Sequence, residues 1–207
     1  MNKTSLTTLP AALALALTLG ACGGGDDPVP PPHPTPSGPF ITDCFTVNKA
    51  ITFAVTSFNV PSDSVGANKS TTEPTTYEGK PATGQTFFYP AGTTTYKDTN
   101  YWTIIDNGVK FIAYISVDGT VIPAPANLFF KQDMAPGETL TDANNNVYTF
   151  VGFEKITLAG KTFSNTCRIK EKDSDGNSDE TWYAPGYGII KQVDAQSGII
   201  VQYSGDL

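Results

Sequence analysis

The sequence has very little of the chemistry on which catalytic and metal sites usually depend. Only one of its 207 residues is a histidine, His33, and it lies in a segment of glycines and prolines without apolar periodicity. A flexible segment of this kind does not hold a general base or a zinc ligand in place. Ser-His-Asp catalysis, Cys-His catalysis and histidine-ligated zinc therefore lose their central residue. The sequence also has no G-x-S-x-G motif and no phosphate-binding glycine loop.

Basic residues are scarce as well. The chain has 13 lysines and arginines against 20 aspartates and glutamates, which gives a net charge of −7. Nucleic acids and anionic bilayers attract proteins through clustered positive charge. We therefore expect no nucleic-acid partner and no membrane binding through surface charge.

Long hydrophobic runs are absent except near the beginning of the chain. Lys3 and the apolar run Leu9–Gly20 have the pattern of a secretory leader, and the run is too short to span a bilayer comfortably. The motif "LGAC" at Leu19–Cys22 resembles the lipobox of bacterial lipoprotein precursors. The resemblance implies cleavage before Cys22 and a diacylglycerol and palmitate anchor on that residue. Gly23, in place of Asp, implies the outer membrane of a Gram-negative cell, with the domain facing the periplasm or the cell surface.

Composition divides the chain into three parts. We expect a lipoprotein signal peptide at residues 1–21, a lipidated Cys22 with a Gly/Pro-rich tether at residues 22–39, and a single β-domain at residues 40–207. Proline-rich chain favours extended polyproline II, so the tether is interpreted as a spacer. A proline-rich recognition ligand is the alternative.

The cysteines predict one cross-link. With Cys22 lipidated, Cys44 and Cys167 remain, and an exported chain meets an oxidising compartment that favours pairing them. We therefore predict a disulfide between Cys44 and Cys167. Two buried free thiols are the alternative.

After Pro39 the sequence is typical of an all-β domain. Short runs rich in Val, Ile, Thr, Phe and Tyr alternate with Gly, Asn, Asp and Pro, and no 3.6-residue stripe is long enough for a stable helix. Asn107-Gly108 and Asp118-Gly119 are strong hairpin signals. We predict an antiparallel meander that forms a curved half-barrel, a barrel or a two-layered β-domain. The expected strands are Ile41–Val47, Ala50–Phe58, Gln85–Tyr89, Asn100–Ile105, Val109–Val117, Leu128–Phe130, Val147–Ile156, Thr162–Glu171, Asp179–Tyr183, Gly188–Val193 and Gly198–Tyr203.

The strand at Thr162–Glu171 shows two faces clearly. One set of alternate residues is expected to face the core: Phe163, Asn165, Cys167 and Ile169. The other set, which includes Thr166, is expected to face water. Cys167 would then be a buried structural cysteine and not a reactive thiolate.

Aromatic residues occur as adjacent pairs, such as Tyr101-Trp102 and Trp182-Tyr183. Neighbours on a strand point to opposite faces, so both faces of the sheet carry aromatic surface. A closed or two-layered fold would explain this simply. The alternative is an aromatic concave face that takes an apolar ligand or a sugar ring. The candidate ligand-facing aromatics are Tyr101, Trp102, Trp182, Tyr183 and Tyr187.

The stretch "DSDGNSDE" is the only candidate metal loop. It offers oxygen ligands suited to calcium at Asp173, Asp175, Asn177 and Asp179. The register is wrong for an EF-hand, because Gly176 stands at the fourth position and Ala184 at the twelfth. A hairpin turn between two strands is the preferred interpretation. We predict no cofactor.

Two segments carry a family resemblance. The sequences "YTFVGFEKITLAGKTFSNTCRIK" and "ETWYAPGYGIIK", between Tyr148 and Lys191, resemble the C-terminal hairpins of small β-rich bacterial envelope lipoproteins of uncharacterised function. The fold of that family is distantly similar to the curved half-barrel of lipoprotein-carrier proteins. The resemblance implies strand and turn geometry and brings no catalytic residues. The helices that plug carrier half-barrels are missing from the pattern.

Three functions remain open at this point. The first is a non-catalytic, membrane-anchored envelope lipoprotein that binds an apolar ligand, a glycan or an envelope partner. The second is a structural surface spacer or adhesin-like module, and the third is a hydrolase that depends on carboxylates or a metal. An open cavity would favour binding, a sealed barrel would favour the spacer, and two facing buried carboxylates would favour the hydrolase. The sequence does not predict an oligomeric state.

Overall fold

The protein is all-β. The computed structural model describes residues 38–62, 64–125 and 127–207, and Gly38–Leu207 form one compact unit. Thirteen strands make a single antiparallel sheet that is curved and not closed. The predicted signal peptide, Cys22 and all of the tether except Gly38 and Pro39 lie outside the described residues. In the part of the chain that is described, no helix is long and apolar enough to cross a membrane.

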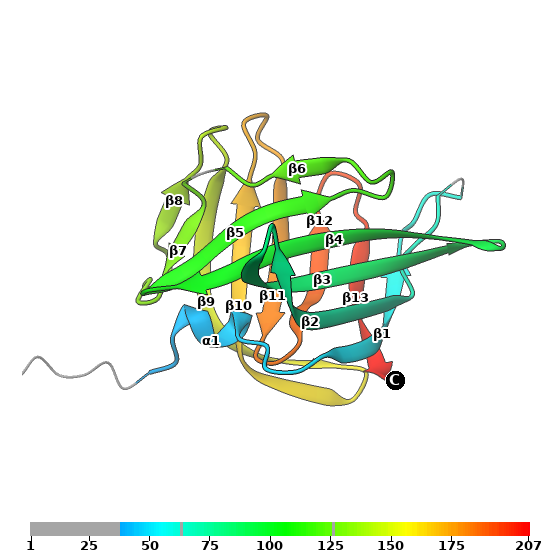
Figure 1. Ribbon diagram of the computed structural model, residues 1–207, viewed down its shortest axis with the longest axis horizontal. Helices are drawn as coiled ribbons and strands as arrows, with labels where there is room; N and C mark the ends of the chain where they lie inside the picture. The colour runs from blue at the N-terminus through cyan, green and yellow to red at the C-terminus, as the bar shows by residue number, and fades with distance from the viewer. Residues whose placement is uncertain (1–37, 63, 126) are drawn as a thin grey trace, which may run out of the picture. The chain divides into compact units, whose positions relative to one another are not determined.

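The sheet consists of two meanders joined along one seam. Its order is β6-β5-β4-β3-β2-β1-β13-β12-β11-β10-β9-β8, with β7 paired to β5, so the first and last strands of the domain, β1 and β13, pair with each other (Figure 1). The N-terminal meander contains β1 (Ile51–Phe58), β2 (Lys69–Tyr77), β3 (Lys80–Ala91), β4 (Thr94–Ile105), β5 (Gly108–Ile115), β6 (Val121–Pro123) and β7 (Phe129–Lys131). The C-terminal meander contains β8 (Thr139–Thr141), β9 (Val147–Leu158), β10 (Lys161–Lys172), β11 (Ser178–Ala184), β12 (Gly188–Asp194) and β13 (Ile200–Asp206).

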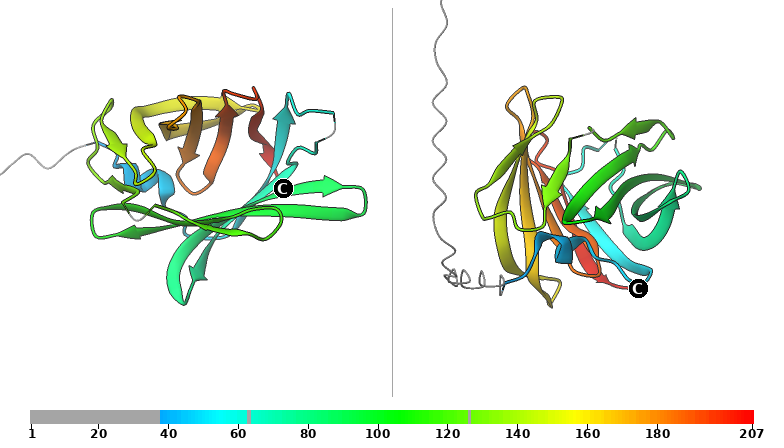
Figure 2. Two further views of the ribbon diagram at one scale, coloured as in Figure 1. Left: turned by 90° about the horizontal axis from the view of Figure 1, so that it is seen from above. Right: turned by 60° about the vertical axis from the view of Figure 1, so that its left-hand side comes forward.

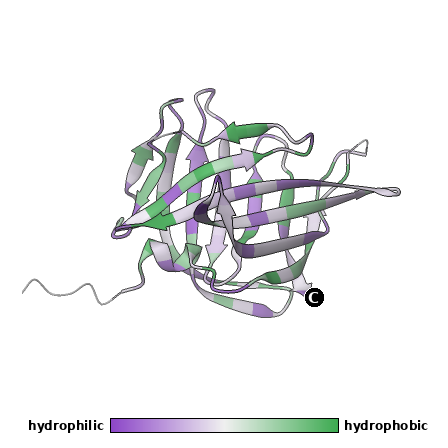
Figure 3. Ribbon diagram, in the orientation of Figure 1, coloured by the Kyte–Doolittle hydropathy of each residue, from purple (hydrophilic) through white to green (hydrophobic). Residues whose placement is uncertain are grey.

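The curved sheet brings its two meanders face to face. Figure 2 shows β3–β5 as one layer and β9–β12 as the other, with the core between them. Figure 3 shows apolar and polar positions interspersed along the strands, and the buried apolar side chains of both layers form one core cluster. Trp102 from the first layer and Phe150 from the second are both fully buried. The predicted all-β fold with a curved antiparallel sheet is confirmed, and the sheet is not closed, so the barrel among the predicted alternatives does not form.

A buried glutamine links the two layers. Gln85 on β3 is fully buried, and its side-chain amide pairs with the backbone of Ile189 on β12 in both directions, with Nε2 donating to the carbonyl at 2.8 Å and Oε1 accepting from the N–H at 2.6 Å. The side chain thus replaces one rung of a strand ladder. Gly188 permits this approach, because its φ is +72° and a Cβ there would lie 2.6 Å from Gln85 Oε1.

One predicted strand is wrong. Residues Ile41–Phe45 form a short helix, α1, instead of the beginning of a strand at Ile41–Val47. Ile41, Cys44 and Phe45 are fully buried, which is the i, i+3, i+4 spacing of a helix face. The Asp43 carboxylate stabilises the first turn by accepting a hydrogen bond from the Phe40 N–H at 2.9 Å. A five-residue helix is too short to show the 3.6-residue apolar periodicity by which helices are recognised in a sequence.

The other predicted strands all lie in or overlap observed strands, but three observed strands were not predicted. β6 and β8 have three residues each, which is too short for a pattern. β2 has the sequence "KSTTEPTTY" and lacks large apolar residues, although Ser70 and Thr72 on it are fully buried. Hydrogen bonds offset the desolvation cost of burying these hydroxyls, since Ser70 Oγ accepts from Gln85 Nε2 at 3.0 Å and Thr72 Oγ1 donates to the Tyr187 carbonyl at 2.7 Å.

The alternation predicted along β10 is broken by a bulge. Between Phe163 and Thr166 the register with β9 shifts, and Asn165 adopts a φ of +54°. Asn165 is therefore exposed and Thr166 is fully buried, which reverses the prediction for both residues. Beyond the bulge the predicted faces return, so Cys167 and Ile169 are buried.

The predicted disulfide is confirmed. Cys44 on α1 is bonded to Cys167 on β10, with a Cα–Cα distance of 5.9 Å and a sequence separation of 123. The bond holds α1 against one end of the inner face. There the Phe45 ring packs 4.3 Å from the ring of Tyr183 and 5.8 Å from that of Phe111. The short helix therefore covers one end of the space between the layers.

Candidate functional site

A cavity of about 600 Å³ lies between the two layers. Residues from β3 to β7 form one wall, and residues from the β8–β9 turn to β12 form the other. The apolar part of its lining comes from both walls and includes Phe87, Phe111, Phe130, Ile169, Tyr183 and Ile189. Ligand-binding pockets in proteins typically have volumes of about 300 to 1,000 Å³ and are lined mainly by such side chains.

The first wall carries a buried carboxylate. Asp98 on β4 is 8% exposed, and its Oδ2 accepts hydrogen bonds from the hydroxyls of Tyr89 at 2.6 Å and Tyr114 at 3.3 Å. Burial raises the pKa of Asp98, and the two tyrosine bonds offset part of that effect. Burial and the adjacent Asp98 charge likewise raise the pKa of Tyr114 to about 12. Oδ1 of Asp98 is buried and has no hydrogen-bond partner among the described residues.

The opposite wall carries a second group of carboxylates. The Tyr148 hydroxyl on β9 donates to Glu171 Oε1 on β10 at 2.9 Å and lies 3.3 Å from Asp142 Oδ2. Burial raises the pKa of Glu171, the Tyr148 bond lowers it, and the nearby charges of Asp179 and Asp142 raise it further. Asp98, Asp142, Glu171 and Asp179 all line the cavity, whereas no lysine, arginine or histidine within residues 38–62, 64–125 and 127–207 does. The lining is therefore both aromatic and acidic.

Two turns of the same construction stand beside each other at the acidic wall. In the β8–β9 turn, Asp142 Oδ1 accepts from the backbone N–H groups of Asn144 and Asn146 at 2.8 and 2.9 Å. In the β10–β11 turn, Asp173 Oδ1 accepts from the N–H groups of Asp175 and Asn177 at 3.0 and 2.8 Å. An aspartate that bonds its own turn in this way is a frequent device of tight hairpins.

The acidic stretch at Asp173–Glu180 is thus a hairpin turn followed by a strand. Asp173 uses both carboxylate oxygens within the turn, since Oδ2 accepts from Asn177 Nδ2 at 2.8 Å, and this side-chain bond is the main reason that its pKa is lowered. Asp179 lies in β11 and not in the turn, and it pairs with Asp194 of β12. Among the described residues, no group of three or more His, Cys, Asp or Glu side chains is arranged to hold a metal ion.

Of the five candidate ligand-facing aromatics, Tyr183 lines the cavity. Trp102 points to the same side but lies in the core beside it, fully buried, with its Nε1 donating to the Phe45 carbonyl at 3.0 Å. Its ring meets that of Tyr183 edge-on at 6.4 Å. Trp102 therefore packs behind the cavity lining and does not line the cavity itself.

Tyr101 and Trp182 lie on the outer face of the sheet, where neighbouring side chains cover them. Tyr101 packs against Tyr77 with a centroid distance of 5.0 Å. Trp182 has the Arg168 guanidinium 5.1 Å and the Lys191 ammonium 4.7 Å from its ring, and its Nε1 donates to Glu154. Charged side chains thus cover Trp182, which is only 5% exposed.

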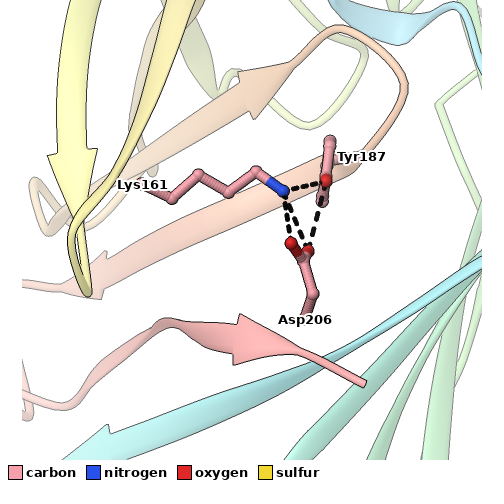
Figure 4. A network of polar contacts seen from close by, with 3 residues as sticks. All are labelled: Lys161, Tyr187 and Asp206. Atoms are coloured by element: carbon pink, nitrogen blue, oxygen red, sulfur yellow. Dashed lines mark hydrogen bonds and ion pairs between the residues drawn. The ribbon is translucent and has the colours of Figure 1, made fainter.

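Tyr187 lies in a separate cluster that does not line the cavity. Its hydroxyl, the Lys161 ammonium and the Asp206 carboxylate form a network that ties the β9–β10 hairpin to the end of β13 (Figure 4). The Lys161 Nζ also lies 4.5 Å from the Tyr187 ring and 5.6 Å from the Tyr203 ring. Partial desolvation lowers the pKa of Lys161, but its bonds to Asp206 and Tyr187 outweigh this and raise it above its ordinary value. The cluster holds the domain's last strand in place.

The sequence contained a signal for the polar residues that were missed. Asp98 and Asn100 have the same strand parity as the buried Trp102, and Glu171 has the parity of Cys167 and Ile169. An acidic residue at a core parity is unusual unless it has partners or a function. Tyr89, Tyr114 and Tyr148 carried no comparable signal, because tyrosines are common on both faces of strands.

Similarity to known proteins is a second way to identify a functional site. In comparisons with known proteins, it matches no family model, no curated protein and no solved structure.

Proposed function

We propose that residues 40–207 form a non-catalytic ligand-binding domain of a cell-envelope lipoprotein. The observation that carries this proposal is the cavity of about 600 Å³ between the layers, with aromatic side chains from both walls and polar groups among them. A surface spacer needs no such space, because a sealed core would stabilise it better. The ligand has an apolar or ring-shaped body, as a lipid fragment, an aromatic compound or a glycan has.

The side chains of the domain support binding without chemistry. Both described cysteines are joined in the disulfide, and no histidine occurs in the described part of the chain. The polar groups that remain around the cavity are carboxylates, tyrosines, amides and the hydroxyl of Thr181. These groups orient a ligand well but do not form a nucleophile-base pair.

A carboxylate-dependent hydrolase is the second candidate, because Asp98 and Glu171 line opposite walls of one cavity. Glycoside hydrolysis needs one carboxyl kept protonated and one kept ionised. Each of these carboxylates instead accepts hydrogen bonds from tyrosine hydroxyls of its own wall, Asp98 from Tyr89 and Tyr114 and Glu171 from Tyr148, which favours binding over hydrolysis. Turnover of nitrophenyl glycosides that Asp98→Asn and Glu171→Gln each abolish would reverse this preference.

Attachment to the outer membrane through a lipidated Cys22 is part of the proposal. It is supported by the leader and the "LGAC" motif. Two or three acyl chains anchor a protein durably, whereas one chain does so only weakly. The intact mass of the protein from its host membrane tests this point. We expect a diacylglycerol-modified chain that begins at Cys22, and an unmodified chain that retains residues 1–21 would contradict the anchor.

Ligand binding is tested by fluorescence titration with N-phenyl-1-naphthylamine, a neutral probe that brightens in apolar surroundings. We expect saturable binding at one site. Thr181→Trp should weaken it by about tenfold or more, because Thr181 is half-buried in the cavity lining and an indole there would fill the space.

The matched control is Val151→Trp, which adds the same indole at an exposed position of β9 outside the lining. It should leave the titration unchanged. Equal binding by both variants, or only non-saturable binding by the original protein, would show that the cavity is not the binding site.

A further inference from the structure

One buried atom of the cavity wall has no hydrogen-bond partner among the described residues. Asp98 is 8% exposed, its Oδ2 is occupied by Tyr89 and Tyr114, and its Oδ1 has no hydrogen-bond partner in the described part of the chain. Buried polar atoms are nearly always bonded in folded proteins, and an unpaired one destabilises the fold, more so when the group is charged. Asp98 also lines the cavity. A ligand at this wall can therefore supply the missing donor once a small rotation turns the carboxylate toward the cavity.

The charge of the lining indicates what kind of donor fits. Among the residues that the structure describes, four carboxylates line the cavity, those of Asp98, Asp142, Glu171 and Asp179, and no basic side chain does. A set of like charges in a recess with apolar walls attracts ions of the opposite sign and repels carboxylates and phosphates. A neutral hydroxyl could bond to Oδ1 but would not neutralise the negative potential of the four carboxylates. A cationic nitrogen satisfies the open oxygen and the field together.

The apolar lining indicates the rest of the ligand. The rings of Phe111 and Phe130 pack edge-on at 5.8 Å, and the Phe111 ring lies 6.2 Å from that of Tyr183. Together with Phe87 these rings give the cavity an aromatic side that can hold an apolar body. Aromatic faces also tolerate a nearby cation better than aliphatic side chains do.

We propose that the ligand is a cationic amphiphile, with an ammonium or guanidinium group that bonds to Asp98 Oδ1 and an apolar body that packs against the aromatic side chains of the cavity. This inference rests on the proposed ligand-binding function and adds the charge of the ligand. Glu171 and Asp142 on the opposite wall strengthen the attraction over a longer range.

Three probes with the same body and different head groups test the proposal: biphenyl-4-ylmethylamine, biphenyl-4-ylmethanol and biphenyl-4-carboxylate. Each is titrated calorimetrically into the full-length protein at neutral pH and low salt. We expect the amine to bind about tenfold or more tightly than the alcohol, because a hydrogen bond to a charged group is worth more than one between neutral groups. The carboxylate should bind most weakly.

Asp98→Asn should remove the preference for the amine while the alcohol still binds, since the amide keeps the shape of the side chain and removes its charge. Glu73→Gln is the charge-matched control, because Glu73 is exposed on β2 and does not line the cavity. It should keep the full preference.

The outcomes distinguish the charge of the ligand from ligand binding itself. Equal affinities of the original protein for the amine and the alcohol would overturn the cationic ligand and leave ligand binding standing, and this comparison does not depend on whether Asp98→Asn folds. A preference for the amine that persists in a folded Asp98→Asn protein would overturn the role of Asp98. Absence of binding by all three probes would count against the proposed function itself.

Discussion

Removal of the disulfide by Cys44→Ala together with Cys167→Ala is expected to lower the free energy of unfolding by about 4 to 5 kcal/mol. The bond closes a loop with a sequence separation of 123 residues, and cross-links of long loops restrict the unfolded chain most. It also fixes α1, whose Ile41 and Phe45 are fully buried. Urea denaturation of the folded domain measures the change.

The reductant provides the control for this prediction. Dithiothreitol should lower the stability of the original protein toward that of the double variant and leave the variant unchanged. A loss below about 1 kcal/mol would mean that the packing of α1 alone holds the end of the domain closed, because the bond would then contribute far less than loop closure predicts.

Trp102→Ala is expected to lower the free energy of unfolding by about 3 to 5 kcal/mol. Trp102 is fully buried, packs edge-on against Phe45 at 6.1 Å, and donates its indole hydrogen to the Phe45 carbonyl. Truncation leaves a large void and a buried carbonyl without its partner. The same loss of support should disorder Tyr183 and weaken binding of N-phenyl-1-naphthylamine.

Tyr101→Ala is the matched control, because it removes the adjacent ring from the opposite face of the same strand. Tyr101 is half-buried and packs against Tyr77, so about 1 kcal/mol is expected, with unchanged probe binding. Equal costs for the two variants would contradict the assignment of Trp102 to the core and of Tyr101 to the outer face.

Much of the fold was predictable because strand periodicity is a local property. The hairpins at Asn107-Gly108 and Gly160 and the stretch after Asp173 could be recognised from turn residues next to apolar runs. α1 could not be recognised, since five residues are too few for a periodic signal. The bulge at Asn165 reverses which side chains of β10 face the core locally, and the alternating pattern of the sequence does not predict it.

The site was less predictable because it depends on how the two meanders face each other. Sequence parity places Asp98 beside Trp102 and Glu171 beside Ile169, but it does not show that the two acids line one cavity. Adjacent aromatic pairs indicated rings on both faces without showing which face was covered. Arg168 and Lys191 cover Trp182, whereas Tyr183, one residue later, lines the cavity.

The most direct test of a ligand-binding cavity is native mass spectrometry of the protein extracted from its host membrane in mild detergent. We expect the intact protein to carry a small molecule that dissociates on activation and is depleted in Thr181→Trp but retained in Val151→Trp. A spectrum that contains only the lipidated polypeptide, in repeated preparations that keep the fold, would contradict it.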